Sequence, residues 1–310
     1  MFKFLHREES GQVMLSRSMS HTVSIIGAGR VGKTIGKRLR QLGWRMGVVV
    51  TRSAATSRAA VRVIGSGTPR TRVTREALDA DLILLATPDR AIAPIARSLA
   101  GLSGGDLRGS IVLHTSGALD SSVLAPLARR GAATGSLHPM QTFCGRTAAK
   151  LAGIVFAVEG DPRAKAVAER IARALGGVPV SVQGKSKPAY HAAGAFAAGH
   201  VLALIEAGTR MLVQLGFTRQ QATQALLPLT RQTLNNFEKW GPRASWTGPI
   251  ARGDFAVVRK HAGSLRLYPR EFRESYAALA RLAGRVLAKD SARTIKQIQR
   301  ALESNRRGNR

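Results

Sequence analysis

Several residue types are scarce in this chain of 310 residues, and each scarcity excludes a class of protein. A single cysteine, Cys144, rules out an intrachain disulfide and is typical of a reducing compartment, so a cytoplasmic location is predicted. Aromatic residues make up only 5%, too few for a surface on which successive nucleic-acid bases stack. Residues 1–21 lack the roughly 7–15-residue apolar core of a secretory signal, and we expect them to form a disordered extension.

Acidic residues are scarce as well. The chain has 18 Asp and Glu against 48 Lys and Arg, a net charge of +30, which raises nucleic acid or an anionic surface as a partner. The basic residues are spread along the whole chain, however, and no zinc-ligand spacing or RNA-recognition signature is present. We favour a solvated basic surface that attracts an anionic cofactor, with non-specific nucleic-acid binding as the alternative; no specific nucleic acid and no metal site are predicted.

Glycine, in contrast, forms a specific pattern. Residues 23–26 have strand character and are followed by three glycines, a helical apolar pattern up to Gly43 and a second apolar run over 46–50. A strand, a glycine turn, a helix and a strand within about 30 residues are typical of the dinucleotide-binding βαβ unit. The glycines allow the tight turn, the approach of a pyrophosphate and close helix packing. Cofactor contacts are therefore predicted at Gly27, Ala28, Gly29, Arg30, Val31 and Gly32.

The end of the second strand distinguishes NAD from NADP. An NAD site would have an acidic residue about 20 residues after the glycines, but the strand here ends in Thr51, Arg52 and Ser53. Arg52 can pair with a 2′-phosphate, and the two hydroxyls can bond to it. NADP is therefore predicted rather than NAD. The alternative is that Arg52 is one of many surface arginines.

Further apolar segments predict a doubly wound, mostly parallel α/β sheet. The expected strands are residues 81–86, 110–114, 132–136, 153–158 and 178–182; the expected helices are 54–63, 91–100, 119–130 and 162–175, and 65–72 is expected to be a turn region. Ligands bind beyond the carboxyl ends of such strands. Ala86, Thr87 and Pro88 should therefore lie beside the ribose and nicotinamide of the cofactor.

Two later strands end close to histidines. His114 with Ser116, and His138 with Gln141, are expected at this same edge of the sheet. A histidine that caps a turn or bonds a backbone carbonyl is the structural alternative for each. From residue 187 the sequence becomes alanine-rich and helical, so residues 22–186 are assigned to a Rossmann domain, 187–303 to a helical substrate and dimerisation domain, and 304–310 to a basic tail.

The apolar stretch 189–215 raises a membrane span, but its histidines and charged residues argue against one. A helix buried between subunits or domains is the preferred interpretation, and no membrane partner is predicted.

Four motifs together resemble an uncharacterised bacterial family that pairs a Rossmann-like domain with a helical C-terminal domain of unknown function. They are GAGRVG at 27–32, LHTSGAL at 113–119, LHPMQTF at 137–143 and TGPIARGD at 247–254, and the resemblance covers residues 22–298. The family is similar in architecture to pyrroline-5-carboxylate reductase, ketopantoate reductase and 6-phosphogluconate dehydrogenase. The resemblance implies a Rossmann sheet followed by an all-helical domain like the C-terminal domain of 6-phosphogluconate dehydrogenase, an NADP-linked activity and a homodimer through the helical domain. It supplies no catalytic residues.

Hydride transfer to C=O or C=N needs a proton donor and a group that orients the substrate. Lys187 and His191 are four positions apart at the start of the second domain, so they share a helix face. Lys187 is the first candidate for proton donor, and the alternatives are a solvated lysine and a packed histidine. The predicted catalytic residues are Lys187, His191, His114 and Ser116; the predicted substrate-binding residues are His138, Gln141, Thr247 and Arg252, unless Arg252 and Asp254 merely form a structural turn.

These observations predict a cytoplasmic, NADP-dependent oxidoreductase. Its substrate would be a small, anionic carbonyl or imine compound bound between the two domains. The alternative from a different functional class is a non-catalytic module that binds and senses NADP.

Overall fold

The computed structural model describes residues 21–103, 107–144 and 149–303. The predicted extension, apart from His21, and the predicted basic tail lie outside these residues. The chain divides into two compact units, which we call the sheet unit, up to Phe196, and the helical unit, from Ala197 onward. The sequence placed this boundary after Ser186. Helix α6 (Lys187–Ala195) belongs to the sheet unit because Lys187 is bonded to its loops, as described below.

The sheet unit is built on one eight-stranded sheet with the order β3-β2-β1-β4-β5-β6-β7-β8. All neighbouring strands pair in parallel except β6 and β7, which are antiparallel, so the prediction of a doubly wound, mostly parallel sheet is confirmed. The strands are β1 (Thr22–Ile26), β2 (Arg45–Val50), β3 (Thr68–Arg70), β4 (Leu82–Leu85), β5 (Ile111–His114), β6 (Ala133–Pro139), β7 (Val155–Gly160) and β8 (Val178–Ser181).

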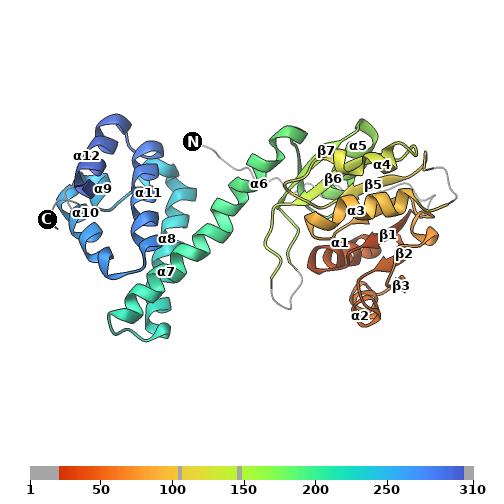
Figure 1. Cartoon of the computed structure of the whole chain (residues 1–310), viewed down its shortest axis with the longest axis horizontal. Coiled ribbons are helices and arrows are strands. Elements are labelled where there is room, and N and C mark those ends of the chain that lie inside the picture. The colour runs from red at the N-terminus through yellow and green to blue at the C-terminus, as the bar shows by residue number, and fades with distance from the viewer. Residues whose placement is uncertain (1–20, 104–106, 145–148, 304–310) are drawn as a thin grey trace. The chain divides into compact units, whose positions relative to one another are not determined.

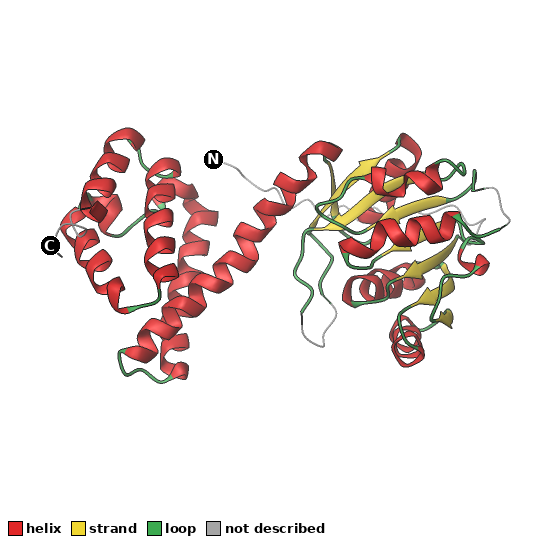
Figure 2. Ribbon diagram, in the orientation of Figure 1, coloured by secondary structure: helices red, strands yellow, loops and turns green. Residues whose placement is uncertain are grey.

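Helices cover both faces of this sheet (Figures 1 and 2). One face packs against α1 (Arg30–Gln41), α2 (Ala54–Ile64) and α5 (Pro162–Ala174). The other packs against α3 (Asp89–Ala100), α4 (Ala125–Ala128) and the short 3₁₀ turns η1 (Arg75–Ala77) and η2 (Ser121–Leu124). Strand β4 shows why the sequence folds this way: Leu82 and Leu84 belong to one core and Ile83 and Leu85 to the other. A strand buried on both faces needs such an uninterrupted apolar run.

Three local predictions were wrong, and tertiary contacts explain each. Residues 65–72 were expected to be a turn region, but Thr68–Arg70 adds strand β3 at the sheet edge, where the missing N–H of Pro69 is tolerated. The helix expected over 119–130 is broken into η2 and α4, with a proline in the first turn of α4. The strand expected to end at Ser136 continues to Pro139, because β7 pairs with it as far as Phe156. This last extension fixes the position of His138.

The helical unit consists of helices that follow the π-helical segment η4 (Phe196–His200). They are α7 (Val201–Gln214), α8 (Arg219–Ala244), α9 (Pro249–Arg252), α10 (Phe255–Ser264), the 3₁₀ turn η5 (Leu265–Leu267), α11 (Arg270–Val286) and α12 (Ser291–Glu303). Thr218 and Gln221 form a capping box at the start of α8, and Gly241 kinks that helix. Within the described residues, Gly184–Gln214 is long and apolar enough to cross a membrane by length and composition alone.

Candidate active site

The glycine loop between β1 and α1 has an open face. Gly27 has φ +91, and a Cβ there would lie 2.7 Å from the backbone nitrogen of Thr87, so the turn requires glycine. A Cβ on Gly32 would lie 2.7 Å from the carbonyl oxygen of Gly27, so α1 could not pack as closely with a larger residue. A Cβ on Gly29 meets nothing within 4 Å. The described side chains therefore leave room above Gly29 for a pyrophosphate.

The first turn of α1 is suited to an anion. Its N-cap, Gly29, offers no side chain to bond the free N–H groups, and the first turn contains no acidic residue. Such N–H groups and the positive end of the helix dipole attract phosphate. Arg30, in the same turn, is exposed and donates a 3.3 Å hydrogen bond from Nη1 to the carbonyl oxygen of Phe143. This contact joins the glycine loop to the loop after β6.

Thr87 supplies an independent sign of a ligand beside the glycine loop. It follows β4, and its Oγ1 is buried without a hydrogen-bond partner among the described residues. An unpaired buried hydroxyl is costly, since it loses its bonds to water. A ligand with hydroxyl or amide groups, such as the ribose or the carboxamide of a nicotinamide cofactor, would satisfy it. The residues present thus fit such a cofactor.

The residues after β2 have distinct roles. The Thr51 hydroxyl lies 2.6 Å from Oγ1 of Thr56, and the Ser53 hydroxyl accepts from the backbone nitrogen of Thr56 at 3.3 Å, so both serve the start of α2. Arg70, on the neighbouring strand, is paired with Glu76 at 2.8 Å. Arg52 is exposed and forms no hydrogen bond or ion pair with any described residue. Its guanidinium is therefore available for an external anion.

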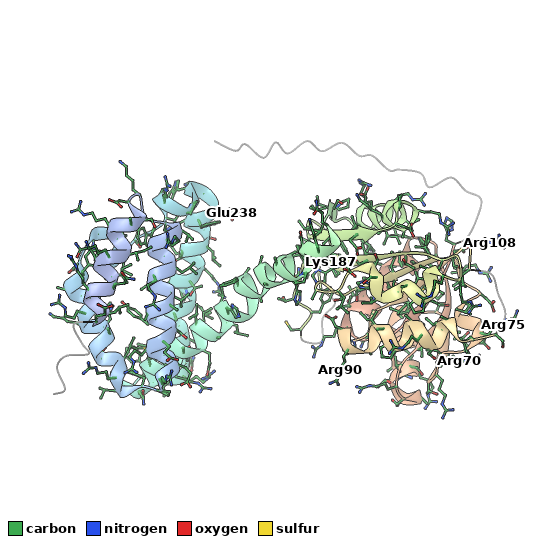
Figure 3. The ribbon with its side chains drawn as sticks, turned by 45° about the horizontal axis from the view of Figure 1, so that its top comes forward. Arg70, Arg75, Arg90, Arg108, Lys187 and Glu238 are labelled. Carbon is green, nitrogen blue, oxygen red and sulfur yellow. The ribbon has the colours of Figure 1, made fainter. Side chains whose placement is uncertain are left out.

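A buried polar network lies beyond the ends of β5 and β6. Lys187, at the start of α6 (Figure 3), is 0% exposed. Its Nζ donates to the carbonyl oxygen of Ser116 at 2.9 Å and to Oγ of Ser136 at 2.6 Å. Ser136 donates to Glu159 at 3.3 Å, and Glu159 accepts from the backbone nitrogen and the hydroxyl of Ser121 at 2.9 and 2.7 Å. The network ties four segments of the sheet unit together.

Burial dominates the electrostatics of Lys187. Desolvation lowers the pKa of its ammonium from 10.5 to about 8, although the nearby carboxylates of Glu159, Asp120 and Asp89 act in the opposite direction. Lys187 was expected to reach the substrate as a proton donor. In the structure it is covered by protein and bonded to it, so the role that the geometry supports is to hold the loops after β5 and β6.

Both ring nitrogens of His114 are also bonded to the protein. It is fully buried; its Nε2 donates to the carbonyl oxygen of Asp120 at 3.1 Å and its Nδ1 accepts from the backbone nitrogen of Ser116 at 3.2 Å. Burial, followed by the charge of Lys187, lowers the pKa of His114 to about 3. The Ser116 hydroxyl accepts from the backbone nitrogens of the two residues after Gly117. His114 and Ser116 therefore stabilise this turn, and both side chains are buried.

Two histidine rings lie against Gly117, and a tyrosine contacts one of them; we call Gly117, His138, Tyr190 and His191 the histidine cluster. Nδ1 of His138 lies 3.0 Å from the Tyr190 hydroxyl. The His138 ring meets the rings of Tyr190 and His191 edge-on, at 5.6 and 5.8 Å between centroids. A Cβ on Gly117 would lie 2.7 Å from Nε2 of His138 and 2.6 Å from Cδ2 of His191. Only glycine lets both rings approach this turn.

The cluster is neutral at His138 and Tyr190 near pH 7. Burial lowers the pKa of His138 to about 4, with further contributions from the charges of Lys187 and His191. Burial raises the pKa of Tyr190 to about 12. A neutral imidazole has one N–H donor and one acceptor nitrogen. His138 can therefore present either function toward Gly117, depending on which way its bond with Tyr190 runs.

Gln141 bonds within its own loop, to the backbone nitrogen of Thr142 at 2.8 Å and to the carbonyl oxygen of Lys150 at 3.3 Å. Thr247 and Arg252 are exposed residues of the helical unit. Asp254 caps α10 through the backbone nitrogen of Val257 at 3.5 Å and forms no ion pair with Arg252 in the described chain. No group of three or more His, Cys, Asp or Glu among the described residues could hold a metal ion.

Sequence reasoning missed Ser136, Glu159 and Tyr190. Tyr190 follows Lys187 by three positions and so shares its helix face, a signal that could have revealed it. Glu159 is the lone acid in β7, VFAVEG, and a charge in an apolar strand indicates a buried partner. Ser136 offered no signal, because only the fold places it beneath Lys187.

Two family descriptions match the sequence. Residues 7–139 match a Rossmann-like domain, and residues 154–283 match the domain of unknown function DUF2520. The chain is a Rossmann-like domain followed by a DUF2520 domain. None of the curated proteins matches the sequence.

Solved structures share the fold of this chain. BF3122 from Bacteroides fragilis, a proposed NADP oxidoreductase, is 20% identical with a TM-score of 0.68, over 89% of this chain and 98% of its own. Pyrroline-5-carboxylate reductase from Coxiella burnetii is 17% identical with a TM-score of 0.54, over 93% of this chain and 98% of its own. The Aspergillus terreus reductive aminase, in complex with NADPH and ethyl levulinate, is 16% identical with a TM-score of 0.56, over 94% of this chain and 96% of its own. The fold is thus that of NAD(P)-binding oxidoreductases.

Proposed function

We propose that this DUF2520 protein is an NADP-dependent oxidoreductase that transfers a hydride to or from a small carbonyl or imine compound. The proposal depends on one arrangement. The open glycine loop follows β1, the unpaired Thr87 hydroxyl follows β4, the Gly117 turn follows β5, and His138 lies at the end of β6. These strands are neighbours and parallel, so all four features lie at one edge of the sheet, where α/β proteins bind ligands.

Hydrogen-bond donors of this chain are available for each polar part of the cofactor. The backbone N–H groups at the start of α1 would hold the diphosphate, and Thr87 would bond the ribose or the carboxamide. Arg52 would pair with a 2′-phosphate, which favours NADP over NAD. When bound, the nicotinamide supplies or accepts the hydride. The solved reductive aminase with NADPH shares this fold, which supports a nicotinamide cofactor.

The proton is assigned to His138. In the neutral ring, a bond from the Tyr190 hydroxyl to Nδ1 leaves the proton on Nε2, the nitrogen that a Cβ on Gly117 would approach to 2.7 Å. As the hydride arrives at carbon, His138 would pass the Nε2 proton to the heteroatom of the substrate while its Nδ1 takes the proton of the Tyr190 hydroxyl. The ring then stays neutral, and Tyr190 would regain its proton from solvent. His191, exposed beside it, would contact the substrate. The net charge of +30 favours an anionic substrate.

The buried Lys187 has a supporting role in this proposal. Its two hydrogen bonds position the Ser116–Gly117 turn and Ser136, and its charge lowers the pKa of His138. A charge held in a low-dielectric site without solvent also stabilises negative charge that develops nearby.

NADPH binding tests the cofactor assignment directly. A Cβ at Gly29 meets nothing within 4 Å, so Gly29→Asp should fold normally while its carboxylate repels the diphosphate. We expect NADPH affinity to fall at least tenfold in a fluorescence titration. Gly109→Asp is the matched control and should leave NADPH affinity unchanged. A Cβ added at Gly109 also meets nothing within 4 Å, and this residue lies before β5, away from the carboxyl ends of the strands. Equal affinity of wild type and Gly29→Asp would refute the assignment.

One observation favours a non-catalytic alternative. Lys187 and His114, two of the four expected catalytic side chains, are fully buried, as in a protein that binds NADP and signals without turnover. A screen of keto acids, aldehydes and cyclic imines, read at the nicotinamide absorbance, separates the two functions. Tight NADPH binding without turnover of any substrate would favour the sensor.

We propose further that the helical unit associates with a second copy. Leu229, Phe237 and Trp240 are 65%, 56% and 55% exposed and share one face of α8. An apolar stripe of this kind is typical of a protein interface. Association would also account for the apolar stretch Gly184–Gln214 without a bilayer. Together with the single cysteine, this interpretation favours a cytoplasmic location.

A further inference from the structure

The helical unit contains a cavity of about 700 Å³ that no part of the proposed function uses. Its walls come from α11 and α12, with contributions from α10 and η5. The volume lies within the roughly 300–1,000 Å³ typical of small-molecule sites. The cavity is therefore large enough for an organic metabolite.

Small side chains keep the cavity open. Ala277 and Ala278 form its α11 wall, and Leu302 adds an apolar patch from α12. A larger residue at either alanine would project into the space, because both belong to the lining. The small side chains of α11 thus leave this space open beside the packed contact of α11 with α12.

Three arginines give the cavity a basic lining. Arg273 and Arg281 lie eight positions apart on α11, with Ala277 between them on the same face, and Arg266 comes from η5. At about 1.5 Å rise per residue, the two α11 arginines start roughly 12 Å apart along the helix. They can therefore approach a ligand from both ends.

The two carboxylates that line the cavity form no ion pair with these arginines in the described part of the chain. Glu274 lines the cavity but is paired with Arg270, outside it, at 2.6 Å. Glu303 also lines it, but no hydrogen bond or ion pair joins it to Arg266, Arg273 or Arg281 in the described part of the chain. The arginines of the cavity differ in this respect from Arg210 and Arg219 of the same unit, which both form ion pairs with Glu206.

We propose that this cavity is a binding site for a small organic anion with two or more negative charges, of the dicarboxylate or phosphate-ester class. Guanidinium groups bind both carboxylate and phosphate in a two-point geometry. The apolar wall formed by Ala277, Ala278 and Leu302 would contact the carbon skeleton between the charged groups. All lining residues belong to the helical unit and none is proposed to bind the cofactor, so the proposal does not depend on the reaction.

Calorimetric titration of the full chain with citrate, and separately with inorganic pyrophosphate, tests the site at constant ionic strength. We expect saturable binding with one site per chain for at least one of the two probes. Arg273→Gln with Arg281→Gln should weaken it at least tenfold. The control is Arg231→Gln with Arg243→Gln, which removes the same charge from exposed positions of α8 and should leave the affinity unchanged.

A second variant covers the case in which the arginine pair fails to fold. Ala278→Met keeps every charge and fills part of the cavity, so it should also weaken saturable binding. The absence of saturable binding to wild type, or equal weakening in the control pair, would overturn the proposal. So would displacement of the bound probe by any RNA of equal charge, since this would indicate general attraction to the basic surface.

Discussion

The ammonium group of Lys187 donates a 2.6 Å hydrogen bond to the hydroxyl of Ser136, and both residues are fully buried. The two residues are 51 positions apart, so the bond fixes the start of α6 against the end of β6. Ser136 passes the contact on to Glu159 on β7. In this structure the ammonium group of Lys187, the predicted proton donor, is thus bonded to the protein itself.

The buried lysine makes stability depend on pH in a predictable direction. The pKa of Lys187 is lowered from 10.5 to about 8 in the folded protein. Between these values the unfolded chain binds more protons than the folded one, so stability rises as pH increases through this window. From about pH 7.5 to about pH 9.5 the gain should approach 2 kcal/mol. Urea denaturation at both pH values should show this increase in the free energy of unfolding for the wild type and not for Lys187→Met.

The upper pH of this measurement matters because of Tyr190. Its pKa is raised to about 12, so above about pH 10 the unfolded chain loses a proton that the folded chain keeps, which lowers stability. The comparison should therefore stay below that pH. An identical gain in wild type and Lys187→Met would show that Lys187 titrates as an ordinary lysine and is not buried in solution.

Arg52 should determine the choice between the two nicotinamide cofactors. Arg52→Ala removes the guanidinium assigned to the 2′-phosphate, so NADPH affinity should fall roughly 10- to 100-fold, about 1.4–2.8 kcal/mol, with little change for NADH. Arg58→Ala is the control, since Arg58 is exposed on the neighbouring α2. Parallel fluorescence titrations with NADPH and NADH measure the ratio of the two affinities. A loss of the same size for both would argue against contact with the extra phosphate.

The bond between His138 and Tyr190 should matter for turnover and not for cofactor binding. Once a substrate is identified, Tyr190→Phe should lower kcat about tenfold and His138→Asn about 100-fold, in the range typical of a lost proton donor. NADPH affinity should stay within twofold of wild type. Tyr268→Phe, in the helical unit, is the control. If His138→Asn retains full kcat, the proton comes from another group.

The apolar stripe on α8 should hold two copies together. Phe237→Asp with Trp240→Asp places charges in the proposed interface, so light scattering after gel filtration should report a monomer where the wild type gives a dimer. Leu267→Asp is the matched control, because Leu267 is 83% exposed but lies outside the stripe. A monomeric wild type, or a dimer that survives both α8 substitutions, would disprove the interface.

The order of the elements and the glycine loop were predictable from sequence because both depend on local pattern. The uninterrupted apolar run Leu82–Leu85 indicates a strand covered on both faces, and the spacing of Gly27, Gly29 and Gly32 indicates a turn into a helix. Strand β3 was not predictable, since three residues that include Pro69 form a strand only when β2 is present to pair with them.

The site divides in the same way. The sequence by itself determined that His114 and His138 would lie at one edge of the sheet, because parallel strands bring their carboxyl ends together. Only the tertiary structure decided which of them face outward. Lys187 is buried because Ser116 and Ser136, distant in sequence, satisfy its ammonium, and His138 reaches Gly117 because β7 extends β6. Burial and the partners of a polar group depend on contacts between segments far apart in the chain, and no local pattern specifies them.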